Sequence, residues 1–90
     1  MNHRRDAQWH SLFDALPERI RVTAKKTFKL LCDDPSHRAL RFKKMRSRHK
    51  GRDCFEVSIT KKYRAVAYVD GDTYYWFWIG THNDFDRKFS

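Results

Sequence analysis

The residues best suited to chemistry form a polar cluster that directly follows an apolar segment near the end of the chain. The cluster contains Thr81, His82, Asn83, Asp84 and Asp86. An imidazole, whose ordinary pKa is about 6.5, can donate or accept a proton near neutral pH, and a neighbouring carboxylate can orient it. His82 and Asp84 are therefore candidate catalytic residues. The alternative is a structural role, in which these side chains only complement the start of a helix.

A second candidate for chemistry is Arg64, which lies within an apolar segment. A charge that is buried alone is costly, so Arg64 either pairs with a carboxylate, for which Glu56 is the local candidate, or faces a wet concave surface. In a phosphoryl-transfer site, an arginine stabilises the charge that develops on the phosphate. Whether Glu56 lies on the same face depends on the turn at Lys61-Lys62, because a slip of one residue would reverse the face.

A third feature is a dense run of cations from Arg41 to Arg52 that no acidic residue interrupts. Lysine and arginine at this density neutralise phosphates and favour salt-dependent, sequence-independent binding to nucleic acid. The alternative is an edge strand that lysines protect from pairing with another chain. The RNA-binding candidates are Lys43, Lys44, Arg46, Arg48 and Lys50, together with Arg87 from the C-terminal segment.

Composition sets the broad class of the protein. A chain of 90 residues predicts one domain over residues 1–90. The net charge of +9 points to nucleic acid or another acidic partner. No apolar run reaches the roughly 20 residues of a membrane span, and no hydrophobic stretch follows the basic N-terminus as in a signal peptide. A cytoplasmic protein that does not contact a membrane is therefore expected.

The cysteines and histidines show no spacing typical of a metal site or a disulfide framework. Cys32 and Cys54 form no C-x-x-C motif, and both are expected to be small apolar residues in or near the core. His37, His49 and His82 are too dispersed for a compact ligand set, so neither a metal nor a cofactor is expected.

Hydrophobic periodicity predicts the elements that position these residues. Helical spacing predicts helices over residues 6–16 and 17–32. Alternation predicts strands over 54–60, 63–69 and 73–79, with a weaker strand over 40–45 and a solvated loop over 46–53. Asp70-Gly71 is typical of a hairpin turn, and the pattern T-x-x-D from Thr81 predicts a short C-terminal helix. This order indicates an α+β fold with two N-terminal helices on one face of an antiparallel sheet.

The hairpin at Asp70-Gly71 also predicts which side chains share a face. A two-residue turn there places Trp76 and Trp78 over Ala65 and Ala67, as large residues packed on small ones. The opposite face is then expected to carry Arg64, Val66, Tyr68, Tyr75, Phe77 and Ile79.

Three motifs resemble the RelE/ParE superfamily of bacterial type II toxin–antitoxin toxins. They are F-K-K at Phe42–Lys44, Y-R-A at Tyr63–Ala65 and W-F-W-I-G-x-H-x-x-x-D at Trp76–Asp86. The resemblance covers about residues 9 to 89. It implies a microbial RNase fold, a cognate antitoxin as partner and, for RelE-like members, metal-independent cleavage of messenger RNA on the ribosome through the ribose 2′-hydroxyl. ParE-like members share the fold but poison DNA gyrase.

Individual site residues follow from this resemblance position by position. Arg64 matches the strand arginine of RelE-like ribonucleases, and His82 matches the basic or histidine position after the last strand. Glu56 and Ser58 fall where RelE carries two lysines, and the catalytic tyrosine of RelE has no match. The resemblance thus implies Arg64 as stabiliser of the transition state, His82 as general acid or base, and Glu56 as a possible base. The alternatives are a gyrase inhibitor without nuclease activity and a degenerate, non-toxic binding module.

Overall fold

The two N-terminal helices begin and end close to their predicted bounds. The computed structural model describes residues 1–89, in which α1 spans Ala7–Asp14 and α2 spans Glu18–Asp33. The Asp6 carboxylate caps α1 by accepting a hydrogen bond of 2.8 Å from the backbone N–H of Trp9. Pro17 directly precedes α2, where its missing N–H costs nothing. No helix in the described part of the chain is long and apolar enough to cross a membrane.

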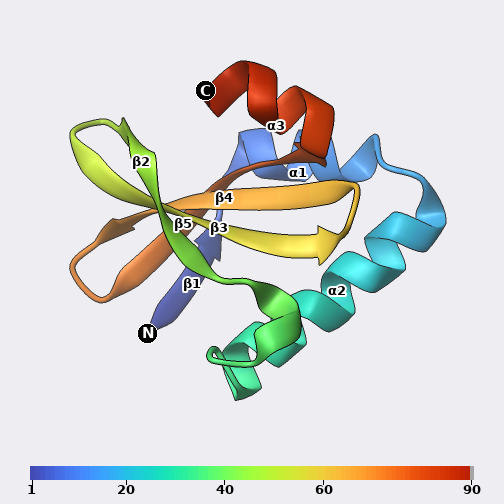
Figure 1. Ribbon diagram of the computed structural model, residues 1–90, viewed down its shortest axis with the longest axis horizontal. Helices are drawn as coiled ribbons and strands as arrows, with labels where there is room; N and C mark the ends of the chain where they lie inside the picture. The colour runs from blue at the N-terminus through green and yellow to red at the C-terminus, as the bar shows by residue number, and fades with distance from the viewer. Residues whose placement is uncertain (90) are drawn as a thin grey trace.

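In residues 1–89, five strands form one sheet between two helical layers. The strands are β1 (Asn2–Arg5), β2 (Lys43–His49), β3 (Arg52–Thr60), β4 (Tyr63–Asp70) and β5 (Thr73–Thr81), in the order β1-β5-β4-β3-β2. A short 3-10 helix η1 (Arg38–Leu40) precedes β2, and α3 (His82–Phe89) follows β5. Figure 1 shows α2 on one side of the sheet and α3 on the other. The predicted α+β class with a short C-terminal helix is confirmed.

Two segments differ from the prediction. Residues Asn2–Arg5, which carry no apolar alternation, form a strand because they pair in parallel with β5. The expected loop over 46–53 is instead a hairpin, since β2 continues to His49 and β3 begins at Arg52. Lys50 and Gly51 both have positive φ values, 54° and 73°, as a tight two-residue turn requires. The weak strand expected over 40–45 starts only at Lys43, after η1.

A β-bulge corrects the predicted faces of β5. Ala67 pairs with Trp76 as expected, but Val66 pairs with Trp78, so Phe77 is an extra residue between them. Trp78 therefore leaves the helix-facing core and packs with Phe77 on the other face. Ile79, predicted on that other face, joins the helix-facing core for the same reason.

The sheet thus separates two hydrophobic clusters. The larger cluster lies under α1 and α2 and includes Trp9, Ile20, Ala24, Leu31, Val57, Ala65 and Trp76. The smaller cluster lies on the opposite face, where Phe85 and Phe89 of α3 cover Val66, Phe77 and Trp78. Cys54 is buried as predicted, whereas Cys32 is exposed because it lies on the solvent side of α2.

One hydrogen bond ties β1 to the core and makes stability depend on pH. The indole Nε1 of Trp76 donates to Nδ1 of His3 over 3.0 Å, so Nδ1 must carry no proton. Burial, and secondly the N-terminal ammonium, lower the pKa of His3 from its ordinary value of 6.5. Below pH 6.5, His3 therefore binds a proton more readily in the unfolded chain than in the folded chain.

We expect the free energy of unfolding to be constant above pH 6.5 with respect to His3, and to fall as the pH decreases below that value. The variant His3→Gln keeps an acceptor for the indole but cannot titrate, so its decline should be shallower. Urea unfolding of both proteins on either side of pH 6.5 measures this difference. Identical pH profiles for the two proteins would rule out His3 as the source. His49, whose pKa burial also lowers, remains as a background in both.

Candidate active site

Arg64 is held firmly on the face of the sheet that α3 partly covers. Its Nη1 donates to the backbone carbonyls of Thr60 and Tyr63 over 2.8 and 3.1 Å, at the turn between β3 and β4. Its Nε lies 3.8 Å from Oε1 of Glu56, and the two side chains are only 13% and 14% exposed. The guanidinium is therefore fixed from two directions. Within residues 1–89 its Nη2 donates no hydrogen bond, which leaves this nitrogen for a ligand.

The register between β3 and β4 determines whether Glu56 lies on the same face of the sheet as Arg64, which the sequence around the Lys61-Lys62 turn left open. Thr60 pairs with Tyr63 across this turn, and Ser58 pairs with Arg64. Because paired residues point to the same face, Glu56, Ser58 and Arg64 share it.

A cation-lined pocket of about 600 Å³ adjoins Arg64, between η1 and the β3–β4 turn. Its charged or polar lining includes His37, Arg38, Arg41, Ser58, Thr60, Lys61 and Arg64. Sequence reasoning did not single out Arg38 or Lys61, because only the tertiary fold brings η1 beside this turn. The left-handed backbone of Arg41, with φ 46° and ψ 41°, ends η1 and places this residue at the pocket.

His82 occupies the first position of α3 and faces a neighbouring pocket. The hydroxyl of Thr81 caps the helix by accepting a 3.1 Å hydrogen bond from the N–H of Asp84, as the T-x-x-D motif predicted. Nδ1 of His82 lies 3.3 Å from Oδ2 of Asp86, and the imidazole is 43% exposed. This contact leaves Nε2 as the nitrogen directed to other partners. The pocket beside it has a volume of about 380 Å³ and is bordered by Lys61 and Lys62.

Arg64 lies on β4 and His82 directly follows the neighbouring strand β5, and their side chains line separate pockets. Arg64 pairs with Gly80 of β5, and His82 follows Gly80 by two residues. Lys61 borders both pockets and so connects their linings. Gly80 lies under the ring of Trp78, where a Cβ atom would come within 2.8 Å of the indole.

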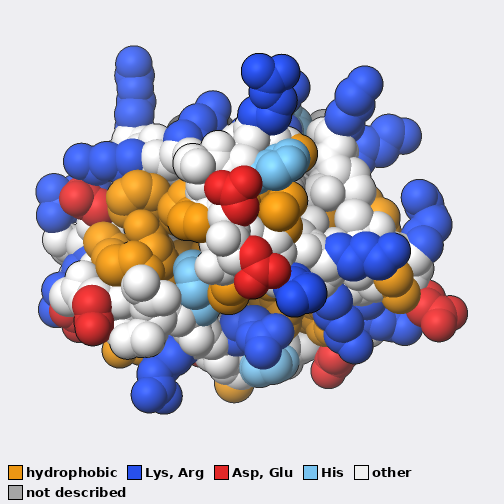
Figure 2. All heavy atoms as spheres, turned by 90° about the horizontal axis from the view of Figure 1, so that it is seen from below, with side chains coloured by type: hydrophobic (Ala, Val, Ile, Leu, Met, Phe, Trp, Pro, Cys, Tyr) orange, Lys and Arg blue, Asp and Glu red, His pale blue; other side chains and the backbone are white. Residues whose placement is uncertain are grey.

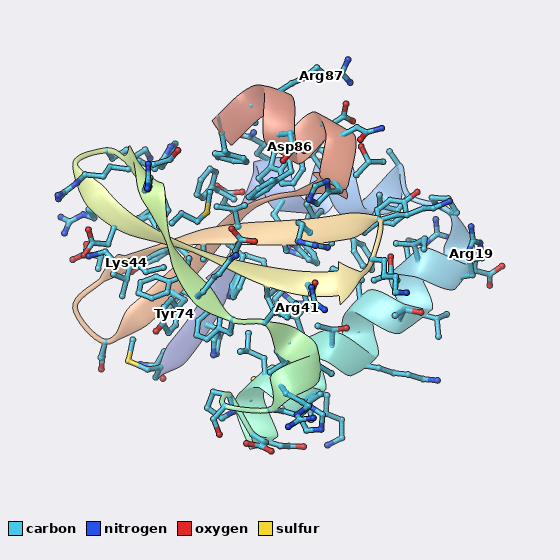
Figure 3. The ribbon with its side chains drawn as sticks, viewed as in Figure 1. Arg19, Arg41, Lys44, Tyr74, Asp86 and Arg87 are labelled. Atoms are coloured by element: carbon cyan, nitrogen blue, oxygen red, sulfur yellow. The ribbon has the colours of Figure 1, made fainter. Side chains whose placement is uncertain are left out.

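The aspartate that faces His82 is Asp86, and Asp84 has a different partner. Asp84 forms an ion pair with Arg87 on the exposed side of α3. The hydrogen bond from Arg87, and then that with Thr81, lower the pKa of Asp84. Figure 3 shows Arg87 pointing away from the sheet. Spacing explains this difference, because residues four apart on a helix, such as His82 and Asp86, lie on the same side.

The predicted RNA-binding residues of the β2–β3 hairpin do not form one uniform patch. Lys43 pairs with Glu56 and so lies on the face of Arg64, whereas Lys44 pairs with Phe55 of the helix-facing side. Asp53 lies 3.5 Å from Lys44 and 3.8 Å from Arg48, which offsets part of their charge. The remaining candidates, Arg46 and Lys50, form no ion pair within the described residues.

A comparison with protein families identifies the chain. The profile of the ParE-like toxin domain matches residues 18–87, which include Glu56, Arg64 and His82. The chain belongs to the ParE-like toxin domain family. The superfamily predicted from the sequence motifs is thereby confirmed. A search of curated proteins gives no significant match.

Solved toxin structures share the fold of this ParE-like domain. A chain of the RelB–RelE antitoxin–toxin complex from Methanococcus jannaschii superposes with a TM-score of 0.72 at 17% identity, covering 97% of this chain and 99% of that one. YafQ from Escherichia coli gives a TM-score of 0.72 at 12% identity, with coverages of 93% and 96%. A chain of the RelBE2 complex from Mycobacterium tuberculosis gives 0.64 at 18% identity, with coverages of 90% and 96%. The predicted RelE-like fold is confirmed.

Proposed function

We propose that this ParE-like domain is the toxin of a toxin–antitoxin pair and cleaves messenger RNA on the ribosome. The observation that carries the proposal is the Arg64 guanidinium, which Glu56 and the turn carbonyls fix at the wall of a cationic pocket. Such a group is suited to stabilise a phosphate that gains charge during reaction. Solved chains of the same fold come from RelB–RelE and RelBE2 complexes, which supports an antitoxin as partner.

The proposed reaction needs only side chains of this chain and the RNA itself. The ribose 2′-hydroxyl attacks the adjacent phosphorus, the bond to the 5′-oxygen breaks, and a cyclic phosphate and a 5′-hydroxyl result. Glu56 accepts the proton of the 2′-hydroxyl, and Arg64 stabilises the non-bridging oxygens. His82, oriented by Asp86, donates a proton to the leaving 5′-oxygen. Lys43 lies on the same face, and the other cations of the hairpin, with Arg87, would contact RNA of the ribosome.

Expression of the chain without an antitoxin tests this proposal. We expect growth arrest, together with messenger RNA fragments that begin with a 5′-hydroxyl, because the reaction leaves that group. The double variant Arg64→Ala and His82→Ala should relieve both effects. The variant Lys26→Ala, on the exposed surface of α2 and outside both pockets, should remain toxic and serves as the control. Toxicity of the double variant with intact transcripts would exclude the ribonuclease.

Inhibition of DNA gyrase is the second candidate, since Glu56 and Ser58 stand where RelE carries lysines and no tyrosine follows His82. Purified gyrase with supercoiled DNA distinguishes the two functions. Trapped cleavage complexes in the presence of the wild-type chain, without RNA fragments in cells, would favour gyrase. A chain that causes neither effect is a non-toxic binding module.

A further inference from the structure

The pocket between η1 and the β3–β4 turn is lined by four cationic side chains. Arg38, Arg41 and Lys61 line it together with Arg64, and no acidic side chain of the described residues contributes to its wall. Arg64 is balanced by Glu56, but the other three side chains form no ion pair or hydrogen bond within residues 1–89. Like charges gathered in a concavity repel one another and attract anions. Figure 2, which views the molecule from the side of η1 and α2, shows lysines and arginines with only scattered acidic side chains.

The local backbone supports a role for Arg41 beyond solubility. Its left-handed conformation is unfavourable for a residue with a Cβ atom, and glycine is the usual choice at such a helix end. An arginine is nevertheless present there, and Figure 3 shows it close to the end of β3. Backbone strain of this kind is found most often at active sites and ligand-binding sites.

The end of β3 is also an open edge, which offers a second explanation for these cations. Pairing with β2 begins only at Glu56, so the last residues of β3 pair with β4 alone. Charged side chains can protect such an edge from pairing with another chain. Edge protection, however, does not require Arg38, Arg41 and Lys61 to converge on one pocket with Arg64.

We infer that this pocket binds a backbone phosphate of single-stranded nucleic acid, next to the phosphate held at Arg64. The inference rests on the proposed function, which supplies a nucleic acid as the ligand. Arg38, Arg41 and Lys61 bind the phosphate oxygens, and the Thr60 and Ser58 hydroxyls lie in the same wall. The pocket thereby sets the path of the strand across the β3–β4 turn, from η1 toward His82.

The test measures binding apart from cleavage. The probe is a fluorescent single-stranded oligodeoxynucleotide of about ten nucleotides, which lacks the 2′-hydroxyl and cannot be cut. The variant Arg41→Gly removes the cation and relaxes the backbone, so its melting temperature should stay within about 5 °C of the wild type. Each lost phosphate contact should reduce the slope of log K against log salt by about 0.7, which is about a five-fold weaker affinity at 0.1 M salt.

The double variant Arg38→Ala and Arg41→Gly should lose about 1.4 from the slope. The variant Arg19→Ala, which removes a cation at the start of α2 away from Arg41, should lose none.

An unchanged slope in Arg41→Gly, or absence of probe binding by the wild type, overturns the inference. Self-association of Arg41→Gly with normal probe binding would instead assign these cations to edge protection. If the slopes fall as expected but the chain cuts no RNA, the pocket stands and the proposed function fails. If the chain cuts RNA and the slopes do not change, the proposed function is supported and the phosphate-binding role of the pocket is excluded.

Discussion

Replacement of Arg64 by alanine is expected to slow RNA cleavage by a factor of about 10² to 10³, because a fixed cation at a reacting phosphate contributes that much to transition-state stabilisation. Arg64→Lys should recover little of the rate. A lysine has no planar fork, so it cannot bond the turn carbonyls and face Glu56 at the same time. The measurement is the single-turnover cleavage rate of ribosome-bound messenger RNA.

Loss of folding must be separated from loss of chemistry in this experiment. Arg64→Ala leaves Glu56 mostly buried without its partner, and this alone can destabilise the domain by about 3 kcal/mol. The matched control is Arg64→Gln combined with Glu56→Gln, which removes both charges and should restore much of the stability but none of the rate. A folded Arg64→Ala protein that cuts within tenfold of the wild type would contradict a catalytic role.

Trp76→Ala is expected to reduce the free energy of unfolding by about 3–5 kcal/mol, a large part of the total for a domain of this size. The Trp76 side chain is fully buried, packs edge-on against Phe28 at 4.9 Å, and holds His3 through its indole nitrogen. Its removal opens a cavity between α2 and the sheet and removes the side-chain hydrogen bond to His3 of β1. Urea unfolding followed by circular dichroism gives the value.

Trp76→Phe serves as the control because it keeps most of the buried ring and loses the hydrogen bond to His3. A loss of about 1–2 kcal/mol is expected for it, the usual value for one such bond and a small cavity. If Trp76→Ala costs less than Trp76→Phe, the indole is not the centre of the core.

Most of the helices and strands could be predicted because local periodicity decides them. The apolar spacing in 6–32 and the alternation in 54–79 each require one face to be buried, and the structure follows both. β1 could not be predicted because Asn2–Arg5 is polar and shows no apolar alternation. It is extended because its backbone forms hydrogen bonds with β5. The bulge at Phe77 could not be predicted from the sequence either, because an unbroken row of aromatic residues is compatible with either register.

The candidate site was predicted in its residues but only partly in its geometry. Arg64 and Glu56 were named as a pair, and the structure places them in contact. The partner of His82 is Asp86, which helix geometry selects over Asp84 once α3 begins at His82. Arg38 of η1 was not predicted as a site residue because it comes from a segment with no periodic signal of its own, and Lys61 was considered only as part of a turn. The catalytic roles of these residues remain predictions.

The parallel pairing of β1 with β5 has a consequence for how the protein is made. Asn2 lies beside Thr73, so the first and last strands in chain order are neighbours, with contacts of very long sequence separation. Contacts of this kind form late and slow the folding of a domain. During translation, β1 must wait unpaired until β5 has left the exit tunnel of the ribosome, and His3 reaches Trp76 only then. Arg64 on β4 and His82, which directly follows β5, therefore reach their final positions only when nearly all of this sheet has been synthesised.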